Sequence, residues 1–151
     1  MKILSILNVS NRERLGADSG VIFHRLLFER LARAGAECVI AAPVDLALQN
    51  VRWAAFESGS NKYDVRFRFD WDATAQLLVA EKPDVLFVNQ VEQTSHFRAL
   101  LVTLGLPTRL IAYCHYWLWC KPSESMKRML GNIARLRRRE LHSRLPAPYC
   151  L

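Results

Sequence analysis

The strongest constraint on the fold is the order of three segments at the start of the chain. Residues 2–9 form a continuous apolar run, residues 19–34 carry apolar side chains at helical spacing, and residues 38–42 form a second apolar run. A run that is apolar on both faces is typical of a strand inside a parallel sheet. Asp18 or Ser19 is placed to cap the intervening helix. The start of the chain therefore predicts one β-α-β unit.

The middle of the chain is less regular, and the alternation resumes from residue 72. The sequence predicts further helices and strands, namely strands over 51–56, 84–89 and 109–115 and helices over 72–81 and 94–104. Residues 63–70 alternate apolar and charged side chains, which predicts a half-exposed strand or ribbon at an edge. Strands that alternate with helices of this length predict an α/β fold, a doubly wound and mostly parallel Rossmann-like sheet with helices on both faces.

The positive charge is concentrated near the last residues. The 151 residues carry a formal net charge of +7, of which residues 1–120 contribute +1 and residues 121–151 contribute +6. We therefore predict a Rossmann-like domain over 1–120 and a basic amphipathic helical tail over 121–151. The apolar face of this tail consists of Met126, Met129, Leu130, Ile133 and Leu136. Such a helix either stays solvated or lies on an anionic membrane surface or in a partner groove.

Composition and motifs argue against several functional classes. No run of 18 apolar residues is present, and the first apolar run lacks the cleavage site of a signal peptide. The four cysteines form no C-x-x-C pair, which favours buried apolar roles in a reducing, cytoplasmic compartment over disulfides or zinc. Neither G-x-G-x-x-G nor a P-loop motif occurs, and we expect no cofactor and no metal. The basic stretch 124–145 has no aromatic residue, which argues against nucleic acid as a partner.

Polar residues follow three of the predicted strands, and the loops that follow parallel strands meet at one edge of a sheet. The first loop enters a helix through residues 16–20, where backbone amides suit a phosphate or an acceptor oxygen. His115 closes the last strand and is the candidate catalytic residue. The candidate substrate-binding residues are Gly16, Asp18, Ser19, Gly20, Asn89, Glu92 and Tyr116.

Each candidate also has a structural alternative. The two glycines serve equally well in a turn and a close helix–strand contact. Asn89 and Glu92 have the residue types of loop caps, and His115 is as well suited to a structural role. His24 lies in the first turns of the predicted helix, and we expect it to be structural.

Several of these strings occur together in one known family. The opening residues 1–9, the turn at 16–20, the helix around 23–35, the strand at 82–89 and the residues 113–116 resemble the N-terminal half of a GT-B glycosyltransferase. The similarity covers about residues 1–120 and is greatest to the large retaining group that uses nucleotide-sugars. Several of the strings are generic to Rossmann-like sheets.

The resemblance implies a transferase that moves a sugar from a nucleotide-sugar donor to a hydroxyl acceptor. In that family the N-terminal domain shapes the acceptor side, so residues 16–20 would approach the acceptor and the donor diphosphate, and His115 would lie near the transferred sugar. A second Rossmann-like domain holds the donor, and this sequence contains none. We therefore expect a fragment, a truncated reading frame or one half of a split enzyme, without sugar transfer by this chain alone. The alternative is a non-enzymatic ligand-binding or interaction module with a docking tail.

Overall fold

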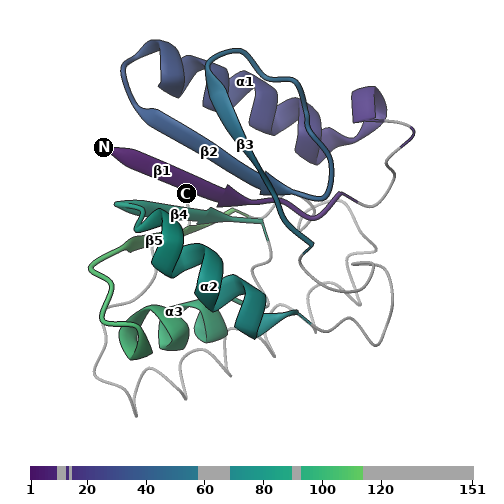
Figure 1. Cartoon of the computed structure of the whole chain (residues 1–151). Coiled ribbons are helices and arrows are strands. Elements are labelled where there is room, and N and C mark those ends of the chain that lie inside the picture. The colour runs from purple at the N-terminus through teal and green to yellow at the C-terminus, as the bar shows by residue number, and fades with distance from the viewer. Residues whose placement is uncertain (10–12, 14, 58–68, 90–92, 114–151) are drawn as a thin grey trace, which may run out of the picture.

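A computed structural model describes residues 1–9, 13, 15–57, 69–89 and 93–113 of the chain, and they form a parallel sheet with helices on both faces (Figure 1). The strands are β1 (Lys2–Ile6), β2 (Glu37–Ala42), β3 (Val51–Ala55), β4 (Val85–Val88) and β5 (Arg109–Ala112). The helices are the short 3-10 turn η1 (Leu15–Ala17), α1 (Ser19–Arg33), α2 (Trp71–Glu81) and α3 (Thr94–Thr103). The predicted α/β architecture is thus confirmed for the described residues.

The five described strands pair in parallel, in the order β3-β2-β1-β4-β5. Four of the five described strands are shorter than the sequence predicts, whereas β2 begins one residue before its apolar run. β1 ends at Ile6 because its pairing with β4 ends where Ile6 lies opposite Val88, and beyond it only Leu7 N–H continues the ladder, to Ala41 O at 2.9 Å. A strand end is set by the partner strand, which an apolar run alone does not reveal.

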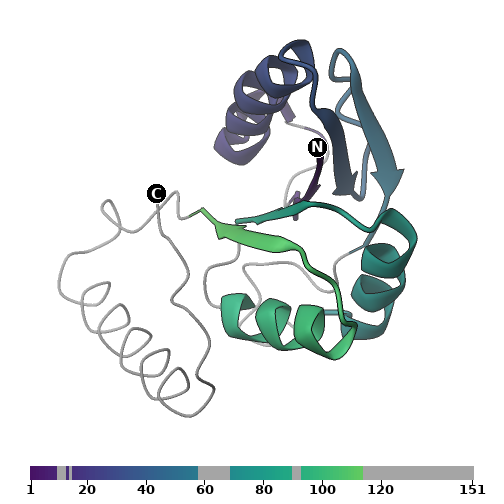
Figure 2. The same cartoon turned by 90° about the vertical axis from the view of Figure 1, so that its left-hand side faces the viewer.

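The side chains of each strand alternate between two apolar layers, as a pleated strand requires. One layer packs under α1 and includes Ile3, Phe28, Cys38, Ile40, Val85 and Phe87. The other packs under α2 and α3 and includes Leu4, Ile6, Leu78, Leu86, Phe97 and Leu101. Figure 2 shows α1 on one side of the sheet and α2 with α3 on the other. The burial of Cys38 agrees with the apolar role expected for it.

The direction in which the chain moves across the sheet reverses at β1. From β1 the chain passes through α1 to β2 on one side, whereas β4 pairs on the other side of β1 and leads through α3 to β5. Such a reversal leaves a crevice between neighbouring strands at their carboxyl ends, where open α/β sheets bind ligands. A functional site is therefore expected at the carboxyl ends of β1 and β4.

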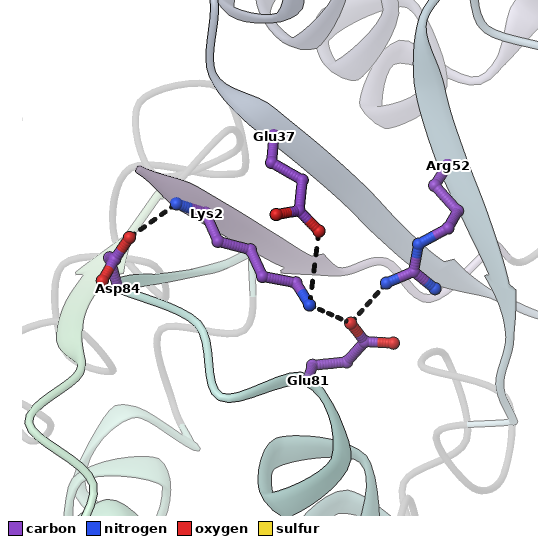
Figure 3. Close-up of polar contacts among 5 residues, drawn as sticks. All are labelled: Lys2, Glu37, Arg52, Glu81 and Asp84. Atoms are coloured by element: carbon purple, nitrogen blue, oxygen red, sulfur yellow. Dashed lines mark hydrogen bonds and ion pairs between the residues drawn. The ribbon is translucent and has the colours of Figure 1, made fainter.

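The opposite, amino-terminal edge of the sheet is held by ion pairs (Figure 3). Lys2 Nζ lies 2.7 Å from Glu81 Oε2 and 3.4 Å from Glu37 Oε1, and Arg52 pairs with the same Glu81 oxygen. Lys2 N–H donates to Asp84 Oδ2 at 2.6 Å. These contacts join three strands to the end of α2, so this edge is a structural clamp.

The clamp shifts the ionisation of its two most enclosed members. The hydrogen bond to Glu81 raises the pKa of the Lys2 ammonium above its ordinary value, against the effect of burial. Burial raises the pKa of the Glu81 carboxyl, but hydrogen bonds from Arg52 and Lys2 outweigh it, so the pKa is lowered. Both shifts mean that folding favours the charged forms.

The basic tail over 121–151 and most of the ribbon predicted over 63–70 lie outside the described residues. Within the part of the chain that the structure describes, no helix has both the length and the apolar character needed to cross a bilayer.

Candidate functional site

The candidate site lies where the carboxyl ends of β1 and β4 meet the first turn of α1. A Cβ atom placed on Gly20 would lie 3.6 Å from Leu7 Cδ1 and 3.9 Å from Asn89 Nδ2. Leu7 directly follows β1, and Asn89 directly follows β4. Two strand ends and one helix start are thus within van der Waals distance of each other, at the position that the reversal of the sheet marks.

Asp18 caps α1 and holds its first amides. Its backbone is extended, with φ −79° and ψ 114°, and its Oδ1 accepts from Gly20 N–H at 2.8 Å and from Val21 N–H at 3.3 Å. Asp18 was one of the two caps that the sequence allows. Because these amides already donate to a carboxylate, the site has a negative charge where a helix start would otherwise attract an anion.

The two glycines of the predicted site differ in what surrounds them. At Gly20 a Cβ would lie 3.1 Å from Asp18 Oδ1, so the absence of a side chain lets the cap, β1 and β4 approach the helix. At Gly16, in η1, a Cβ would meet nothing within 4 Å. The close helix–strand contact that was the structural alternative for the glycines is therefore found at Gly20, whereas Gly16 is exposed.

Two asparagine side chains at the strand ends have buried atoms without a partner among the described residues. Asn8 is only 7% exposed, and the unpaired atom is its Nδ2; Asn89 is half-buried, and the unpaired atom is its Oδ1. β1 and β4 are neighbouring strands, Asn8 lies two residues beyond the end of β1, and Asn89 directly follows β4. A buried polar atom without a partner costs about 1–3 kcal/mol, and native proteins keep few of them.

His24 joins β1 to α1 behind this site. Its Nδ1 lies 2.7 Å from Gly20 O, a carbonyl that only accepts, so Nδ1 carries the proton and Nε2 accepts from Ser5 Oγ at 2.8 Å. Burial lowers the pKa of His24 from 6.5 to about 4, although the bond to Gly20 O and the Asp18 charge act in the opposite direction. The imidazole is therefore neutral and structural, as its place in the sequence predicts, and it fixes the position of Gly20.

Aromatic rings pack beside His24 on the α1 face of the sheet. Phe23 stacks on Tyr113, with centroids 4.1 Å apart and planes 4° apart, and Phe87 lies 6.1 Å from both rings. Tyr113 directly follows β5. β5 therefore reaches the carboxyl edge next to α1, on the same side as Gly20.

The structure brings together only part of the predicted constellation. Asp18, Gly20 and Asn89 converge, Ser19 is half-buried at the first position of α1, and Gly16 lies apart in η1. The candidates Glu92, His115 and Tyr116 lie outside the described residues. Sequence reasoning missed Asn8. The sequence signal that could have identified it is a polar residue near the end of an apolar run. The structure adds that β1 has already ended at this position.

Comparisons with protein families and with curated proteins found no match to this chain. Among the residues that the structure describes, no three His, Cys, Asp or Glu side chains are grouped so that they could hold a metal ion.

Proposed function

We propose that this chain is the acceptor-side domain of a glycosyltransferase, which holds a hydroxyl-bearing acceptor while a nucleotide-sugar donor is bound by a second domain. One support is the likeness of residues 1–120 to the N-terminal half of GT-B enzymes. The observation that carries the proposal is the pair of amide atoms, Asn8 Nδ2 and Asn89 Oδ1, that lack a partner within the described residues at the reversal point of the sheet. Ligands of open α/β sheets bind at that point.

The chemistry would be the transfer of a glycosyl group from the donor to the acceptor hydroxyl. Holding the two substrates in one orientation supplies a large part of the rate enhancement in such bimolecular reactions. The leaving diphosphate needs electrostatic stabilisation, which falls to the second domain in this proposal. The chain supplies the acceptor platform, with β1, β4 and α1 as rigid supports for Asn8, Asn89 and Asp18. His115 remains the proposed residue near the transferred sugar.

Saturation-transfer NMR with free sugars tests the proposal. We expect glucose, mannose, galactose and N-acetylglucosamine to differ in signal, and at least one to bind with a Kd of about 1–10 mM, since a millimolar Kd corresponds to only about −4 kcal/mol. The purified chain mixed with nucleotide-sugar and acceptor should show no sugar transfer. Absence of saturation transfer to all four sugars would overturn the proposal, and so would turnover by the chain alone.

A binding module without catalysis is the second candidate, and the same buried amides favour it, because they need a ligand and not a reaction. Transfer activity distinguishes the two. When the chain is combined with a donor-binding GT-B domain, the glycosyltransferase proposal requires incorporation of labelled sugar into an acceptor that the chain binds. If the acceptor binds and no label is incorporated with any donor, the protein is a binding module.

A further inference from the structure

We infer that the α1-side face of β4 and β5 is the docking surface for a later segment of this same chain, residues 124–142. The inference does not depend on the proposed function, because it concerns what covers the sheet and not what the strand ends bind. Of the described α-helices, α2 and α3 pack on one face of the sheet and α1 alone packs on the other (Figure 2).

α1 covers only part of its face. Its close backbone contacts with the sheet are mainly to β2 and β3. Five strands spaced about 4.8 Å apart span about 19 Å between the two edge strands, whereas one helix with its side chains is about 10 Å wide. The α1 side therefore has room for a second helix, over β4 and β5.

The strand side chains on this part of the sheet are less completely covered than those on the opposite face. On β4, Leu86 and Val88 face α2 and α3 and are fully buried. Val85 and Phe87 face the α1 side, and each is 8% exposed. On β5, Ile111 also faces the α1 side and is only half-buried. These three α1-side residues form an apolar surface, here called the β4–β5 surface, over which no described helix lies.

The flank of α1 that borders the β4–β5 surface is apolar as well. Phe23 and Leu27 lie one helical turn apart, are half-buried and pack against the same core layer. The Phe23 ring stacks on Tyr113, which directly follows β5, with centroids 4.1 Å apart. This stack closes the surface at the carboxyl edge of the sheet. A helix placed beside Leu27 and over Ile111 would bury apolar area on both.

The position of Tyr113 indicates which segment covers this surface. The chain leaves β5 at the carboxyl edge beside Phe23, and α3 already packs on β5 from the opposite face. Residues 114–123 connect Tyr113 to the segment, and ten residues reach up to about 33 Å. This reach is longer than β5, so the segment can return over the β4–β5 surface.

The apolar stripe of the segment has the length of the surface. It spans residues 126–136, or about 15 Å at 1.5 Å per helical residue, whereas the four residues of β4 or of β5 span about 13 Å. Its side chains are those of Met126, Met129, Leu130, Ile133 and Leu136. Docking covers this stripe and leaves the basic residues in water, so the segment meets an anionic surface through charge alone.

Spectra and amide hydrogen exchange of the full chain test the inference. The wild-type chain is compared with Ile133→Asp, which places a charge in the centre of the stripe. Arg135→Gln is the matched control, because residues two apart lie on different faces of a helix. Ile111→Asp changes the sheet side of the same contact.

Ile133→Asp should shift the backbone amide signals of Ile111 and Tyr113, and Arg135→Gln should leave them in place. Amides of residues 126–136 should exchange at least about tenfold faster in Ile133→Asp and in Ile111→Asp than in the wild-type chain. Protected α2 amides show that a variant is folded. If Ile111→Asp loses that protection, Ile133→Asp decides alone.

Unprotected amides over 126–136 in the wild-type chain would overturn the inference, and so would unchanged Ile111 and Tyr113 signals in Ile133→Asp. A second copy of the chain is the other possible occupant. In that case the wild-type chain sediments as a dimer that Ile111→Asp dissociates, and the Ile111 signal changes on dilution. This result would also overturn the inference.

Discussion

Ser5 Oγ donates to His24 Nε2 at 2.8 Å, across the interface between the first strand and the first helix. Both side chains are fully buried, and the other ring nitrogen holds Gly20 O. The Gly20 carbonyl, which only accepts, sets the protonated nitrogen of the imidazole, and Ser5 holds the other nitrogen from the strand side. The imidazole thereby connects β1 to the first turn of α1 at the candidate site. This relationship links the stability of the domain to the geometry of its site.

The stability of the domain should depend on pH through His24. Folding lowers the pKa of His24 from its ordinary 6.5 to about 4, so the unfolded state binds more protons between these limits. The stability that depends on a neutral His24 is fully present above pH 6.5 and is lost as the pH falls toward 4. It amounts to about 3 kcal/mol, at about 1.4 kcal/mol per pKa unit. Urea midpoints between about pH 7 and pH 4 should therefore fall less steeply in His24→Phe than in the wild-type chain, with His96→Gln as the control. If the urea midpoint depends equally on pH in the wild-type chain and in both variants, His24 is not the source of the pH dependence.

Ser5→Ala should destabilise the domain by about 1–3 kcal/mol, because it leaves the buried His24 Nε2 without a donor. Thr103 provides a matched control, since its hydroxyl donates to Ala99 O at 2.9 Å on an exposed helix position. Thr103→Ala should cost less than about 0.5 kcal/mol. Urea unfolding of both variants gives the comparison. Equal losses would mean that the Ser5–His24 contact adds nothing to ordinary hydroxyl bonding.

Glu81→Gln should cost about 1–2 kcal/mol at pH 7, because it leaves Lys2 and Arg52 close together without their shared, largely buried partner. Since the pKa of Glu81 is lowered by folding, its contribution is present above pH 4.5 and is lost below it. The difference from the wild-type chain should thus shrink at about pH 3. Glu37→Gln is the control, because the Glu37 side chain is 61% exposed and its pair should contribute less than about 0.5 kcal/mol. A Glu81→Gln loss that persists in acid would contradict the clamp.

The basic tail over 121–151 should bring the chain to anionic vesicles at low salt. Residues 124–142 combine an apolar stripe with six basic side chains, and attraction between exposed charges is screened by salt. Sedimentation with phosphatidylserine vesicles should show binding that is lost at high salt, and none with phosphatidylcholine vesicles. A chain that ends at residue 120 is the control. Binding that survives high salt, or no binding at low salt, would rule out this role.

Alanine substitutions at Asn8 and Asn89 should weaken sugar binding without an equal loss of stability. Removing a buried polar atom that has no partner costs little and can stabilise, so the unfolding midpoint of Asn8→Ala should stay the same or rise. Affinity for the bound sugar should fall at least about fivefold in Asn8→Ala and Asn89→Ala, as for the loss of one hydrogen bond of about 1 kcal/mol. Thermal unfolding with and without sugar measures both quantities. A lowered midpoint with unchanged affinity would make the asparagines structural.

The layers of this fold could be predicted from the sequence because the information that determines them is local. Apolar runs identify β1, β2 and β4, and Gly35, with φ of +90°, ends α1 as the spacing indicates. The contacts that hold the sheet edge are not local. The pairing of Lys2 with Glu81 and of Arg52 with Glu81 depends on strand order, which periodicity does not contain.

The candidate site shows the same division. Asp18 and Asn89 were predicted because they follow a strand or precede a helix. Asn8 was hidden, because strand ends are set by pairing with β4 and the apolar run continues through Val9. The sequence also did not show that Asp18 accepts from the first amides of α1, because it allowed Ser19 as the cap as well.

Mapping sugar binding on the asparagine side chains decides whether the ends of β1 and β4 form the acceptor site. In a 15N–1H spectrum of the full chain, the side-chain NH2 signals of Asn8 and Asn89 should shift on addition of the sugar that binds. The side-chain signal of Gln49, which lies just before β3 at the opposite edge of the sheet, should not move and serves as the reference. Binding that leaves both asparagine signals in place, or that shifts only residues of the Lys2–Glu81 clamp, would show that the acceptor binds elsewhere.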